Sequence, residues 1–126
     1  FEVRYPEYQL EFFVHEDSIA FVPQSKQPPA SFEIRYSDLS TIQGYPNEWR
    51  TAEEYTISLK KSFQKTVIAG TEWIDVSDLS EEGYFYRWLF VFKDQTMIEI
   101  SYNWFFGFEY YEDTFDQILS TFKFIE

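Results

Sequence analysis

The sequence of 126 residues has no cysteine, a single histidine and no long apolar run. Without cysteine the chain can form no disulfide framework, no thiolate nucleophile and no cysteine-based zinc site. No run approaches the roughly 18 apolar residues that a membrane-spanning helix needs. Only ten residues are Lys or Arg, against 22 Asp and Glu, so the formal charge is -12. Because nucleic acid is bound through a basic surface, it is not an expected partner.

Aromatic side chains, by contrast, are abundant. Phe, Tyr and Trp make up 23% of the residues. Each ring removes on the order of 150–250 Å² from water when it is buried. The length fits one domain over residues 1–126, and the rings can supply its core without disulfides or metal.

The alternation of apolar and polar residues predicts the strands. They are expected at residues 1–5, 10–14, 19–22, 32–36, 72–76, 84–92 and 97–104. Residues 84–92 are apolar on both faces apart from Arg87, which indicates a strand that is covered on both sides. Consecutive prolines predict a loop within residues 24–29, and residues 37–50 look irregular.

Two helices are expected. Thr51 and Glu54 form a capping box that begins the first. We expect it to end near residues 67–70, with Lys60, Lys61 and Lys65 on its solvated face. The second begins at Glu112 or Asp113, and its buried stripe is formed by Phe115, Ile118, Leu119 and Phe122. The order of elements predicts an α+β domain, an antiparallel sheet of about six to seven strands with two main helices packed on it.

This layout resembles the PsbP-like family. The resemblance covers nearly the whole chain and is most specific at its ends, in Phe1-Glu-Val-Arg-Tyr-Pro6 and in Phe115-Asp-Gln-Ile-Leu-Ser-Thr-Phe-Lys-Phe124. It implies an α/β/α sandwich that binds other proteins without catalysis, outside the cytoplasmic membrane, either secreted or tethered. A lipid anchor upstream of Phe1 would fit this expectation, with the chain a mature or trimmed fragment. The sequence departs from the family where Glu7-Tyr-Gln9 follows Tyr-Pro in place of an early Trp.

Polar residues give weak signals of chemistry. His15 lies beside Asp17 and Ser18 in a turn, where the three cannot converge as a catalytic triad. The acids Asp75, Asp78, Glu81 and Glu82 lie around one turn, which is either solvated or a Ca²⁺ site, although they do not follow an EF-hand order. A second acidic group suits the N-terminus of the last helix, and its members are Glu109, Glu112, Asp113 and Asp116. We therefore predict that the protein is not an enzyme and binds no cofactor.

The strongest candidate site is the connection between the last strand and the last helix. Trp104 is expected to point inward, but the rings that follow cannot all do so across a loop that contains Gly107. Either the loop forms a small core of its own, or it presents aromatic anchors to a partner. The predicted partner-binding residues are Phe105, Phe106, Phe108, Tyr110, Tyr111 and Trp49.

Two functions follow from these features. The first is a monomeric, non-catalytic domain that binds a protein partner, as yet unidentified, through the aromatic loop. The alternative is a small-ligand module that binds carbohydrate or Ca²⁺ at the aromatic loop or the acidic turns.

Overall fold

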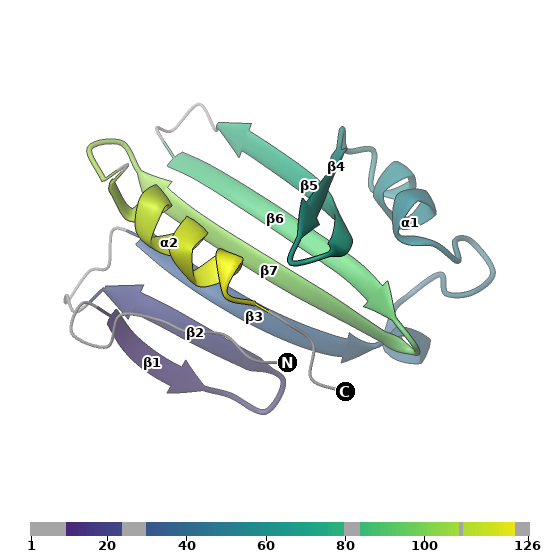
Figure 1. Cartoon of the computed structure of the whole chain (residues 1–126). Coiled ribbons are helices and arrows are strands. Elements are labelled where there is room, and N and C mark those ends of the chain that lie inside the picture. Colours follow the sequence, from purple (N-terminus) through teal and green to yellow (C-terminus); the bar gives the residue numbers. More distant parts are fainter. Residues whose placement is uncertain (1–9, 24–29, 80–83, 109, 123–126) are drawn as a thin grey trace.

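The computed structural model describes residues 10–23, 30–79, 84–108 and 110–122, and shows one seven-stranded antiparallel sheet (Figure 1). The strands lie in the order β1-β2-β3-β7-β6-β5-β4. Their bounds are Leu10–Val14, Ser18–Pro23, Ala30–Asp38, Gln64–Ile68, Thr71–Leu79, Tyr84–Lys93 and Thr96–Phe105 for β1 to β7. The α+β prediction is confirmed. The strand predicted at residues 1–5 lies outside the described residues.

The helix α2 (Tyr110–Ser120) lies across one face of the sheet (Figure 1). Its predicted stripe is confirmed, because Phe115, Ile118 and Leu119 are all buried, as is Phe122 just beyond the helix. They pack against the alternate residues of β7, including Ile100 and others that were expected to point inward. The register pairs Ile100 with Ile34 on β3 and with Leu89 on β6, so these buried side chains share one face.

The opposite face has its own core over β5 and β6. It is covered by the short helices η1 (Leu39–Thr41) and α1 (Ala52–Ser58) and by the segment between them. Trp49 packs there against Tyr55, at 4.5 Å between ring centroids, and Tyr55 in turn contacts Phe90 on β6. The strand β6 thus buries Leu89 on one face and Phe90 on the other, as its doubly apolar pattern predicted.

The first helix is much shorter than its sequence predicted. Thr51 caps it as expected, accepting from the amide of Glu54, but α1 ends at Ser58 and residues 64–68 form β4. Lys60 has φ 58°, which a continuing right-handed helix cannot contain. The residues that follow include the β-branched Thr66, Val67 and Ile68, which favour a strand.

A tight turn explains why β4 pairs with β5. Ala69 and Gly70 connect the two strands and have φ values of 49° and 83°. Two successive positive φ values are those of a two-residue hairpin turn whose twist matches the flanking strands. Lys65 therefore lies on a strand and not on the predicted helical face, and its ammonium pairs with Glu53 of α1 and, at 3.8 Å, with Glu72 of β5.

Candidate functional site

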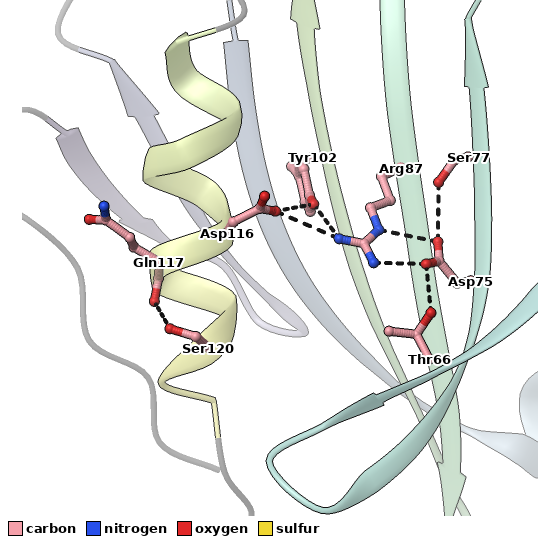
Figure 2. Close-up of polar contacts among 8 residues, drawn as sticks. All are labelled: Thr66, Asp75, Ser77, Arg87, Tyr102, Asp116, Gln117 and Ser120. Carbon is pink, nitrogen blue, oxygen red and sulfur yellow. Dashed lines mark hydrogen bonds and ion pairs between the residues drawn. The ribbon is translucent and has the colours of Figure 1, made fainter.

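A polar network runs from α2 across the neighbouring strands of the sheet (Figure 2). Arg87, the polar exception in β6, donates from Nε to Asp75 Oδ1 at 3.2 Å and from Nη2 to Asp75 Oδ2 at 2.7 Å. Asp75 lies on the neighbouring strand β5, and its side chain is only 1% exposed. Thr66 and Ser77 also donate to this carboxylate, at 2.9 and 3.2 Å. A two-point Arg–carboxylate pair of this kind fixes both side chains.

The network continues from the sheet to α2. Arg87 Nη1 donates to the Tyr102 hydroxyl at 2.7 Å, and that hydroxyl donates to Asp116 Oδ1 at 2.6 Å. Asp116 Oδ1 also lies 3.6 Å from Arg87 Nη1. The side chains of β4, β5, β6, β7 and α2 are thereby joined, so the network holds the helix in register on the sheet.

The protonation states in this network are set by competition between burial and charge. Burial by itself would raise the pKa of Asp75, but the hydrogen bonds and charge of Arg87, with the Thr66 and Ser77 hydroxyls, outweigh it and lower the pKa. For Arg87, burial opposes the charged form, yet Asp75 and Tyr102 raise its pKa. Burial and the bond to Asp116 raise the pKa of Tyr102. Asp75 and Arg87 are therefore charged at neutral pH, and the Tyr102 hydroxyl stays neutral between Arg87 and Asp116.

A groove of about 320 Å³ opens beside this network, between α2 and the β4–β5 hairpin. Its polar lining comes from Arg87, Asp116 and Ser120, and the rest is aliphatic: Val67, Ile68, Ala69 and Leu119. A second hollow, of about 310 Å³, touches Asp75 from the side of Ser62, Phe63 and Gln64. Sequence reasoning named Asp75 and Asp116 as acidic candidates but missed their connection through Arg87, although one arginine in an otherwise apolar strand was a signal that it needed a buried partner.

The connection between β7 and α2 carries the second candidate site. Gly107 has φ 92°, a conformation that favours glycine, and the Phe108 amide closes the turn on the Phe105 carbonyl at 3.0 Å. This turn directs four rings outward, which we call the aromatic patch: Phe105, Phe106, Phe108 and Tyr110, exposed by 47, 57, 36 and 59%. Phe108 and Tyr110 lie 6.2 Å apart between ring centroids.

Two other predicted partner-binding rings do not belong to the aromatic patch. Trp49 is 2% exposed, and its indole donates to the Gln43 carbonyl at 3.1 Å within the second core, so its ring is not at the surface. Tyr111 is half-buried, because its ring stacks on Phe115 at 6.0 Å. The predicted inward position of Trp104 is confirmed, since the side chain is buried and stacks on Phe85 at 4.0 Å.

Among the four acids around the predicted acidic turn, Asp75 is the one whose side chain the structure describes. Asp75 is in a strand and paired with Arg87, so it does not belong to a solvated turn. The side chains of Asp78, Glu81 and Glu82 lie outside the described residues. In the part of the chain that is described, no three His, Asp or Glu side chains come together as metal ligands. His15 is exposed in the turn between β1 and β2, as expected.

Comparisons with known proteins show the fold and nothing more specific. No family model and no curated protein matches the chain. Among solved structures, a protein from Bacteroides thetaiotaomicron VPI-5482 is similar, with a TM-score of 0.64 and 15% identity over 98% of this chain and 44% of that one. A protein of unknown function from Pseudomonas aeruginosa, PA94, described as a putative regulator, has a TM-score of 0.51 and 12% identity over 94% of this chain and 99% of its own.

The chain thus spans less than half of the Bacteroides protein. At identities this low the structural similarity shows shared architecture alone. It says nothing about function, because one fold can serve many functions. The PsbP-like resemblance stays a prediction. The helices of the described ranges include none that is long and apolar enough to cross a membrane.

Proposed function

We propose that this chain is a non-catalytic interaction domain of the PsbP-like type, acting outside the cytoplasmic membrane, and that the aromatic patch binds its protein partner. The single observation behind the proposal is the exposure of four neighbouring rings within residues 105–110. Single exposed apolar side chains are ordinary, but a contiguous group marks an interaction surface.

The position of the aromatic patch supports this role. It lies between β7 and α2, two elements whose other faces are held by the main core and by the Arg87 network. The patch is therefore presented from a rigid base, which limits the entropy lost when a partner binds. Large aromatic anchors of this kind dominate the energy of many interfaces.

The test is affinity capture from a native envelope extract with chemical cross-linking. Wild type is compared with Phe106→Asp and with a matched control, Ile57→Asp, which introduces the same charge at a 64% exposed position on α1. The proposal expects one protein to be captured by wild type and control and lost with Phe106→Asp. Capture that is equal in all three, or a Phe106→Asp variant that no longer folds, would refute it.

A further inference from the structure

We propose that the groove between α2 and the β4–β5 hairpin binds a lysine or arginine side chain presented by a partner protein. The groove shares no residue with the aromatic patch, so this proposal does not depend on the function proposed for the patch.

The groove has the shape and lining that a long cationic side chain needs. Its volume of about 320 Å³ is at the lower end of the range for ligand pockets. Ile68 and Ala69 of the hairpin and Leu119 of α2 contribute aliphatic surface to its lining. Lysine and arginine bury their methylene stems against such walls while the charged head reaches a polar group. That polar group is the carboxylate of Asp116, which is 47% exposed at the groove.

The Asp116 carboxylate has capacity left for a ligand. Its Oδ1 accepts from Tyr102 and lies near Arg87. Within the ranges that the structure covers, its Oδ2 accepts no hydrogen bond. An ammonium or guanidinium group at Oδ2 would form a charge-assisted bond without displacing any existing contact.

Charge decides between a cation and an anion. Arg87 also lines the groove, but two of its nitrogens are already bonded to Asp75, and that pair is neutral as a unit. Asp116 adds a negative charge, and Glu112 lies one turn earlier on the same helix. The sequence has no Lys or Arg between Lys93 and Lys123, so α2 itself supplies no compensating cation. Burial, together with the like charges of Asp116 and Asp113, raises the pKa of Glu112.

The test is an NMR titration of the ¹⁵N-labelled protein at fixed ionic strength. The probes are n-butylammonium and n-butylguanidinium, which mimic the two side chains, and butyrate, which has a similar apolar stem and the opposite charge. Saturable shifts are expected for the amides of Ala69, Gly70, Leu119 and Ser120 with both cations and not with butyrate. The variant Asp116→Asn keeps an acceptor for Tyr102 and should weaken cation binding at least tenfold.

The matched control is Asp113→Asn, which makes the same charge change outside the groove lining and should leave binding within twofold of wild type. Ser120→Phe fills the groove from an exposed position and should also abolish binding, so the outcome does not rest on one variant. Absence of saturable shifts, binding of butyrate as tight as that of the cations, or equal weakening by Asp113→Asn and Asp116→Asn would each overturn the proposal.

Discussion

Replacement of Arg87 by leucine tests whether the buried network stabilises the fold. The substitution leaves Asp75 charged, with its side chain 1% exposed and with the hydroxyls of Thr66 and Ser77 as its remaining donors among the described residues. Removal of one partner of a buried pair costs about 3–5 kcal/mol, because the remaining charge is uncompensated. Since the Arg87 side chain is itself 20% exposed, we expect the lower figure, about 3 kcal/mol. For a chain of this size that corresponds to a melting temperature lower by roughly 12 °C.

The pH dependence gives this prediction a specific signature. In the wild type the pKa of Asp75 is lower in the folded than in the unfolded protein, where it is about 3.9. The stability that this difference contributes is fully present at pH values above about 3.9 and is lost as the pH falls through the folded pKa. In the variant, burial dominates and raises the folded pKa, so the penalty is full at neutral pH and disappears below about 3.9. The stability difference between the two proteins should therefore shrink from pH 7 to pH 4.

Urea unfolding followed by tryptophan fluorescence at several pH values measures both effects. The control is the double variant Arg87→Leu with Asp75→Leu, which removes the unpaired charge and should recover most of the lost stability. A loss below 1 kcal/mol for Arg87→Leu, or a double variant as unstable as the sum of the two single changes, would refute the reasoning.

Three further predictions concern other parts of the fold. Trp49→Ala should lower stability by about 3–5 kcal/mol in denaturant titrations, because the ring fills the second core; an effect below 1 kcal/mol would contradict its burial. Gly44→Ala should be more destabilising than Gly70→Ala, although both glycines have positive φ. A Cβ at Gly44 would lie 2.6 Å from Trp49 Nε1, whereas a Cβ at Gly70 would have no atom within 4 Å. Equal melting temperatures for the two variants would argue against this. Burial raises the pKa of Glu99 despite the charge of Arg35, so Glu99→Gln should stabilise the protein at pH 7 and have little effect near pH 4, as thermal melts at both pH values would show.

Local sequence was sufficient to predict an element and its buried side wherever that element buries one regular face. The alternation in β7 and the spacing of Phe115, Ile118 and Leu119 were interpreted correctly because each is a repeated pattern along the chain. The cap at Thr51 was also found, because a capping box lies within four residues. The error over residues 60–68 came from extending the first helix past Lys60, whose positive φ ends it and cannot be recognised from the sequence pattern.

The candidate sites, too, could be predicted from the sequence only in part. An excess of rings over core volume can be seen in the sequence, which left open whether Phe105 and Phe106 pack within the loop or are exposed; in the structure both are exposed. The sequence does not show which rings lie outside the core. Trp49, for example, is buried by residues of β6 that follow it by about 40 positions. The pairing of Arg87 with Asp75, and of Tyr102 with Asp116, likewise depends on strand register and helix position.

The sequence by itself determined the α+β class, the buried stripe of α2 and the inward position of Trp104. These features follow from periodicity, which acts over a few neighbouring positions. Only the tertiary structure decided the network centred on Arg87 and the groove beside Asp116. Those features are made by residues from different strands and from α2, and they exist only once the strand order brings these elements together.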